Sequence, residues 1–177
     1  MTVTVTPQQF TYVAFDAGVI ERIANELLTS LGLADHDLVI EVDETSPLAR
    51  TRVEPGDPIS IRAESGAFED LKRPRQQSET VTATSLGRVL LRVRDRLLAG
   101  FGEAPADKDL TLAQMAAWET YCIGRLERLG VAVNQQRWRY NFRNRHGFTD
   151  QADAAFDRLW ASDGLTWDDL QAISSAA

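Results

Sequence analysis

The sequence predicts an α+β fold, with a small N-terminal antiparallel sheet that carries one packed helix, followed by a mainly helical C-terminal half. Two segments in the first half, residues 37–44 and 59–64, alternate between apolar and polar side chains, as half-buried strands do. After residue 82, apolar residues recur at helical spacing instead. This change predicts a sheet subdomain at residues 1–70 and a mainly helical subdomain at residues 71–177, packed together as one compact unit.

The N-terminal part is expected to begin with a strand at residues 10–15, which are mostly apolar and aromatic. A helix is expected over about 17–31, with Asp16 as its N-cap. Gly32 stands where a C-terminal glycine belongs, so the helix should end there.

The next strands are expected at residues 37–44, 50–53 and 59–64. The last two flank a Pro-Gly-Asp-Pro turn and should therefore pair as a hairpin. Residues 66–81, which contain a Lys-Arg-Pro-Arg run, are expected to form a mobile connection.

Four helices are expected in the C-terminal half, because local start and stop signals bound their apolar stripes. Thr111 and Gln114 can form a capping box at one start, and Thr166 with Asp169 can cap the last helix. The expected spans are about 83–99, 111–129, 150–161 and a short helix after Thr166. The core-facing residues of the second of these helices should be Leu112, Met115, Cys122, Leu126 and Leu129.

The pattern of residues 131–146 is compatible with either a strand or a helix. As a strand, it would separate the aromatic Trp138, Tyr140 and Phe142 from the arginines by the alternation of faces. As a helix, it would end at Gly147 in a Schellman-type motif, with basic residues beside the negative end of the helix dipole.

The same segment holds most of the candidate binding residues. Its arginines could pair with phosphates while its aromatic rings stack on bases, which would make a single-stranded nucleic-acid or phosphate-ligand site. Alternatively, the rings belong to the core, and the arginines pair with the acidic residues at 35–44 or with Asp150, Asp153 and Asp157. The candidates are Arg137, Trp138, Arg139, Tyr140, Arg143, Arg145 and His146, together with Arg73 and Arg75 of the Lys-Arg-Pro-Arg run.

Carboxylates near the ends of two predicted strands are weaker candidates for a metal site. Asp43 ends one strand, and Glu64 and Glu69 end or follow another, so they could gather at one sheet edge. Paired carboxylates can perform acid–base chemistry or hold Mg²⁺ or Ca²⁺. The alternative is a solvated acidic rim. No other metal site and no cofactor are predicted, because zinc-ligand, phosphate-loop, dinucleotide and nucleophile-elbow motifs are missing from the sequence.

Charge is divided into three blocks along the chain. Residues 1–70 carry 13 acidic residues against 4 arginines, whereas residues 71–147 carry 14 basic residues against 7 acidic ones. Residues 148–177 return to a net charge of −5. Such a division indicates either a polyanion site or acidic and basic parts that dock within one fold or between copies. The overall charge of −7 opposes nucleic acid at long range.

The single Cys122 excludes an internal disulfide framework, and the N-terminus lacks the features of a secretory signal, so a reducing cytoplasm is expected. No apolar run reaches the roughly 18 residues of a membrane span, so no membrane partner is expected. These patterns favour a soluble binding or interaction protein over an enzyme, with a protein partner or a second copy as its ligand. The alternatives are a nucleic-acid or phosphate-ligand protein that uses the arginines, and a carboxylate enzyme with a divalent ion.

Overall fold

The computed structural model describes residues 2–98 and 100–177. The chain forms two compact units, which are called the first unit (up to Arg94) and the second unit (Asp95–Ala177). The boundary falls inside helix α2 (Glu79–Leu97), later than the division at residue 70 that the sequence pattern indicates. No helix in the described parts of the chain combines the length and the apolar composition that a membrane crossing requires.

The α+β class is confirmed, with an N-terminal sheet and a mainly helical C-terminal half. The sheet consists of β1 (Val3–Thr6), β2 (Leu38–Asp43), β3 (Thr51–Glu54) and β4 (Ile59–Glu64), in the order β1-β2-β4-β3.

The expectation of an antiparallel sheet is wrong for most of it, because β1, β2 and β4 are parallel and only the predicted β3–β4 hairpin is antiparallel. Helix α1 (Ala17–Ser30) returns the chain to the start of the sheet, so β2 must run in the same direction as β1. Alternation of apolar and polar side chains along a strand indicates that one face of the sheet is exposed to solvent. It does not indicate whether the neighbouring strands are parallel or antiparallel.

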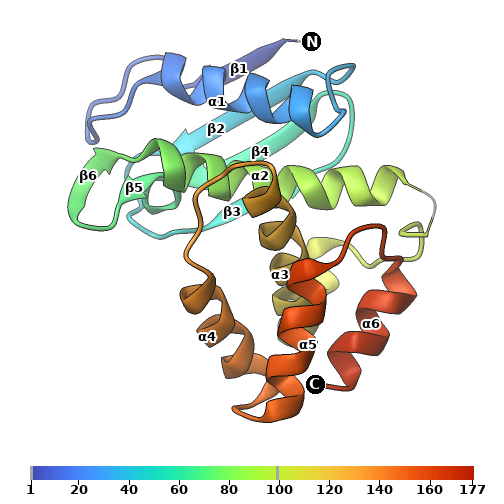
Figure 1. The fold of residues 1–177 in the computed structure, drawn as a ribbon. Helices are drawn as coiled ribbons and strands as arrows, with labels where there is room; N and C mark the ends of the chain where they lie inside the picture. The colour runs from blue at the N-terminus through green and yellow to red at the C-terminus, as the bar shows by residue number, and fades with distance from the viewer. Residues whose placement is uncertain (1, 99) are drawn as a thin grey trace. The chain divides into compact units, whose positions relative to one another are not determined.

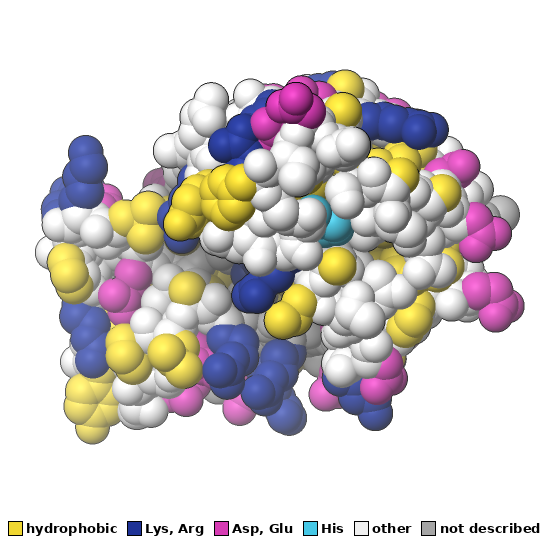
Figure 2. All heavy atoms as spheres, turned by 90° about the horizontal axis from the view of Figure 1, so that it is seen from below, with side chains coloured by type: hydrophobic (Ala, Val, Ile, Leu, Met, Phe, Trp, Pro, Cys, Tyr) yellow, Lys and Arg dark blue, Asp and Glu magenta, His cyan; other side chains and the backbone are white. Residues whose placement is uncertain are grey.

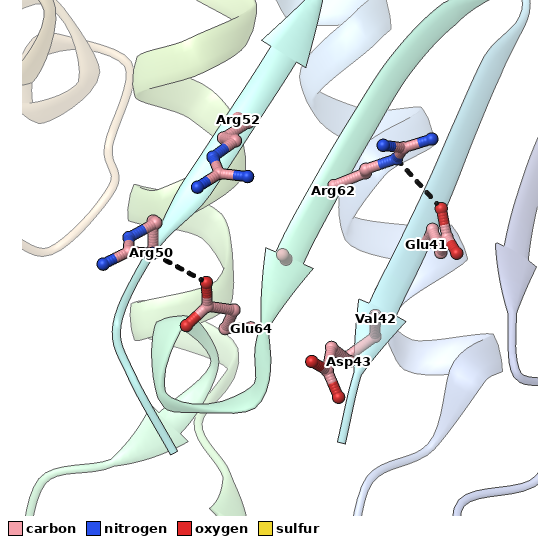
Figure 3. A pocket seen from close by; sticks show the side chains of 8 residues that line it. Glu41, Val42, Asp43, Arg50, Arg52, Arg62 and Glu64 are labelled. Atoms are coloured by element: carbon pink, nitrogen blue, oxygen red, sulfur yellow. Dashed lines mark hydrogen bonds and ion pairs between the residues drawn. The ribbon is translucent and has the colours of Figure 1, made fainter. Parts of the chain in front are cut away.

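One face of this sheet is buried and the other is open. Figures 1 and 3 show α1 and α2 on the same side of the sheet. The strand side chains that face them are buried: Val5, Leu38, Ile40, Val42, Val53, Ile59, Ile61 and Ala63. The alternate positions, which form the open face, are polar and at least partly exposed, with Val39 as the apolar exception. The open face is therefore the one surface of the sheet where side chains can meet a ligand.

Two segments of the first unit differ from the sequence prediction. Residues 10–15 are not a strand; Phe15 packs its ring near Phe10 and Phe68, at centroid distances of 5.5 and 6.4 Å. Their aromatic composition reflects packing and not strand pairing. The first strand is β1 instead, whose alternating Val and Thr residues the prediction missed.

Residues 66–81, predicted as a mobile connection, fold into a short 3-10 helix (Ser65–Ala67) and the hairpin β5 (Glu69–Asp70) and β6 (Arg73–Gln77). The acidic side chains of β5 hold this hairpin. Asp70 accepts the backbone N–H groups of Lys72 and Arg73, and Glu69 accepts that of Arg75 at 3.1 Å. These local hydrogen bonds make the segment an ordered turn.

The second unit contains α3 (Leu112–Arg128), α4 (Gln135–His146), α5 (Asp150–Ala161) and α6 (Trp167–Ser175), preceded by a short 3-10 helix (Asp107–Asp109). The predicted capping box is present at α3, and the predicted cap of α6 by Thr166 and Asp169 is a capping box as well. Helix α4 answers the open question about residues 131–146 in favour of a helix.

The core-facing prediction for α3 is correct for Cys122 and Leu126, but Leu112 and Leu129 are exposed because they lie at the helix ends.

Candidate functional site

Helix α4 places the aromatic and basic candidate residues, and local signals explain both of its ends. The side chain of Asn134 caps the start by accepting the backbone N–H of Arg137 at 3.1 Å. Gly147 ends the helix at φ 105°, a backbone conformation that favours glycine. The helix has no acidic residue, and three basic residues stand in its last turn. Arg143 and Arg145 therefore lie where the helix dipole favours positive charge, whereas Arg137 stands in the first turn.

The inner side of α4 is structural. Phe142 is buried and lies edge-on to Phe156 at 5.8 Å between ring centroids. His146 stacks on Phe142 at 3.9 Å, and its Nε2 lies 3.0 Å from the hydroxyl of Ser174. Burial lowers the pKa of His146, although a hydrogen bond to the backbone of Phe142 acts in the opposite direction. His146 is thus packed against Phe142 and Ser174, and its burial favours the neutral form of the imidazole.

Two of the four candidate arginines are held by α5. Arg143 forms a bidentate pair with Asp153, through bonds of 2.8 and 2.6 Å. Arg139 makes ion pairs with Asp153 and Asp157 and covers the ring of Phe156 at 4.3 Å. The hydrogen bond from Arg143 lowers the pKa of Asp153. The structure therefore contains the α5 acid pairs that the sequence offered as the alternative to a binding role, although Asp150 makes no ion pair within residues 2–98 and 100–177.

The outward side of α4 is different. Arg137 and Arg145 are exposed, and neither forms an ion pair with any residue that the structure describes. Tyr140 is 58% exposed, and its ring meets that of Phe148, which is 63% exposed, edge-on at 5.8 Å. These residues, together with the exposed Asn141 and Asn144, are called the α4 surface. Trp138 is half-buried and lies at its margin.

Figure 2 shows exposed hydrophobic and basic side chains next to one another, with acidic side chains also present in the view. Such mixing of exposed aromatic and guanidinium groups is typical of interaction surfaces.

The remaining candidate arginines, Arg73 and Arg75, belong to β6 in the first unit. Arg73 pairs with Asp70 at 3.1 Å. Arg75 has a left-handed backbone, with φ 67°, and its guanidinium donates to the backbone oxygen of Glu44 at 3.1 Å. Both arginines stabilise the turns around the β5–β6 hairpin.

The candidate carboxylates do not converge as a set. Asp43 and Glu64 are register partners on β2 and β4. Glu69 instead accepts the hydroxyl of Ser65 at 2.8 Å and the backbone N–H of Arg75. Within residues 2–98 and 100–177, no three metal-ligating side chains gather in a way that could hold an ion.

A groove of about 530 Å³ lies on the open face of the sheet (Figure 3). Its lining combines the side chains of β2, β3 and β4 with one residue that precedes β3: Glu41, Val42, Asp43, Arg50, Arg52, Arg62, Ala63 and Glu64. The alternation of these segments already placed Glu41 and Arg62 on outward faces. The sequence allowed these two strands to be neighbours, but it did not indicate that β2 and β4 run parallel, in the register that sets Glu41 opposite Arg62.

Most charges of this groove are paired. Arg62 bonds to Glu41 at 3.1 Å, and Arg50 lies 3.4 Å from Glu64. The hydroxyl and the backbone N–H of Thr45 lower the pKa of Asp43 through hydrogen bonds.

Comparison of the chain with known protein families, curated protein sequences and solved structures found no match.

Proposed function

We propose that this protein is a binding protein that recognises an acidic segment of a protein partner through the α4 surface. One observation carries the proposal: Arg137 and Arg145 have no ion pair among the described residues and stand beside the exposed Tyr140–Phe148 ring pair. The α4 surface contains no acidic residue of its own. Carboxylates from outside the chain are thus the groups that complement it.

The chemistry of these side chains supports a protein interface. Tyrosine and arginine are enriched among residues that dominate binding energies, because both combine a large contact area with directional hydrogen bonds. A guanidinium can bind a carboxylate in bidentate fashion. Arg139 and Arg143 fix α4 against α5, so the outward residues are held in place before a partner arrives, which lowers the entropy cost of binding.

Nucleic acid is less well supported. With only two free arginines on the α4 surface, about two phosphates could be neutralised, which corresponds to a logarithmic salt slope of roughly −1.4 for a single strand. The net charge of −7 also repels a polyanion before contact. A short acidic peptide needs only two carboxylates and one apolar side chain to match the surface.

The test is a fluorescence anisotropy titration with two labelled probes, a Glu-rich peptide that contains leucine and a single-stranded oligouridylate, at about 50 and 200 mM salt. The peptide should bind more tightly than the RNA. Tyr140→Ala and Arg137→Gln should each weaken peptide binding by about tenfold, the loss expected for a central interface residue. Arg158→Gln removes an exposed charge from α5 and should leave the affinity unchanged.

Tighter binding of the RNA, with a steep salt dependence, would assign the surface to nucleic acid instead. Absence of peptide binding at the lower salt concentration would refute the proposal. If light scattering gives the mass of a dimer for the wild type and the mass of a monomer for Tyr140→Ala, the partner is a second copy of this chain.

A further inference from the structure

We propose that the groove on the open face of the sheet binds a small zwitterion of amino-acid to dipeptide size, with its carboxylate on Arg52, beside Arg62, and its ammonium on Asp43. This inference concerns the first unit alone and is independent of the α4 surface. The volume of about 530 Å³ lies within the range of small-molecule sites.

The charges of the groove are sorted by strand (Figure 3). The charged residues that β2 contributes to the groove are both acidic, Glu41 and Asp43. The charged residues on the opposite side are both basic: Arg52 belongs to β3, and Arg50 precedes β3. The central strand β4 contributes one charge of each sign. The groove thus has an acidic side and a basic side, and a ligand with charges of both signs has one preferred orientation in it.

Residues of like charge occupy neighbouring positions on both sides, although the guanidinium of Arg62 is turned toward Glu41 and the carboxylate of Glu64 toward Arg50 (Figure 3). Arg52 and Arg62 occupy directly opposite positions of the antiparallel β3–β4 pair, on the same open face. Asp43 and Glu64 are neighbours in the parallel β2–β4 register. Like charges in such positions destabilise a sheet. An anion between the two arginines and a cation beside the two carboxylates would relieve both repulsions.

The internal ion pairs leave one charge of each sign for a ligand. Glu41 engages Arg62, and Glu64 engages Arg50. Among the residues that the structure describes, neither Arg52 nor Asp43 has an ion pair. Asp43 is hydrogen-bonded only within its own turn, to Thr45 and the backbone of Ser46.

Binding should be weak, because the side chains of Arg62 and Glu41 are 71% and 62% exposed and water competes for them. We expect a dissociation constant on the order of 1 mM for glycylglycine as the probe.

The experiment is a nuclear magnetic resonance titration of the whole chain that follows the backbone amides of β2–β4 and the arginine Nε–H signals. Glycylglycine is compared with acetate, methylammonium and inorganic phosphate. The zwitterion should bind about tenfold more tightly than either single-charge probe, because it uses both sides of the groove. Arg52→Gln and Asp43→Asn should each weaken its binding about fivefold. Glu54→Gln, an exposed charge change on β3 outside the groove lining, is the matched control and should have no effect.

Equal affinity for acetate or phosphate and for glycylglycine would overturn the zwitterion assignment and leave an anion site. Absence of shifts in the β2–β4 signals up to about 50 mM glycylglycine would overturn the site altogether. Arg52→Lys keeps the charge but loses the bidentate geometry, so an intermediate affinity is expected. An affinity unchanged by both Arg52 variants would also contradict the proposal.

Discussion

Asp95 and Arg125 form an ion pair inside the core of the second unit. They are 1% and 6% exposed, and both oxygens of Asp95 accept hydrogen bonds of 2.7 Å from the guanidinium. The indole N–H of Trp118 donates to the same carboxylate at 2.8 Å. Burial is the largest single influence and acts to lower the pKa of Arg125. The hydrogen bonds that Arg125 donates to Asp95, together with the electrostatic attraction of neighbouring groups, outweigh burial, so the pKa of Arg125 is raised.

Asp95→Asn should lower the free energy of unfolding of the second unit by roughly 3–5 kcal/mol, because it leaves a buried guanidinium without its counterion. Urea unfolding followed by tryptophan fluorescence measures this loss. Asp109→Asn changes an exposed aspartate of the same unit and should stay within about 0.5 kcal/mol. Replacing both partners, with Asp95→Leu and Arg125→Met, should cost less than Asp95→Asn alone. A loss below about 1 kcal/mol for Asp95→Asn would show that the pair is not needed for stability.

For single residues, the sequence predicts ion-pair partners only where the two residues belong to segments that are close in the chain. The acidic residues of α5 were one of the two partner sets predicted for the α4 arginines, and Asp153 and Asp157 do pair with Arg139 and Arg143. The Asp95–Arg125 pair joins residues on different helices, and no spacing or motif marks it. The same limit applies to Arg52 and Arg62, whose juxtaposition depends on the register of two strands.

Helix starts are the elements that sequence locates best. Each of four N-cap side chains accepts a backbone N–H group in the first turn of its own helix: Asp16, Thr111, Thr149 and Thr166. The capping residue and the group that it caps therefore lie within four residues of each other in the sequence. Strand direction and the order β1-β2-β4-β3 depend on contacts between distant segments, and alternation contains no information about them.

Helices α3 and α5 are in close contact at Gly124, and the absence of a side chain there allows the short distance between the two helices. A Cβ atom at this position would lie 2.1 Å from the backbone oxygen of Trp160. Gly124→Ala should therefore force α5 away from α3 and lower the melting temperature, at a cost of about 1–3 kcal/mol or more.

Thermal unfolding followed by tryptophan fluorescence tests this expectation. Gly102→Ala is the control, because no atom lies within 4 Å of a Cβ at that position. Equal melting temperatures for the two variants would contradict the close contact.

At the scale of the whole molecule, the two units differ in their spectroscopic reporters. All four tryptophans, Trp118, Trp138, Trp160 and Trp167, belong to the second unit, whereas helix and sheet in the first unit contribute to far-ultraviolet circular dichroism. Fluorescence therefore observes one unit and circular dichroism observes both.

We expect Asp95→Asn to shift the fluorescence transition in urea to lower concentration while part of the circular dichroism transition keeps its midpoint. The physical reason is that each unit buries its own core and can lose it separately. Coincident transitions that shift together in wild type and variant would instead mean that the units unfold as one.

The pairing of β1 with β2 also has a consequence during synthesis. Val3 aligns with Leu38, so the first strand has no sheet partner until the ribosome has added about 35 more residues. At roughly 5–20 residues per second, this delay lasts about 2–7 seconds. For that time β1 is an unpaired edge, the kind of backbone that recruits strands from other chains. Its alternating threonines keep one side of the waiting strand polar.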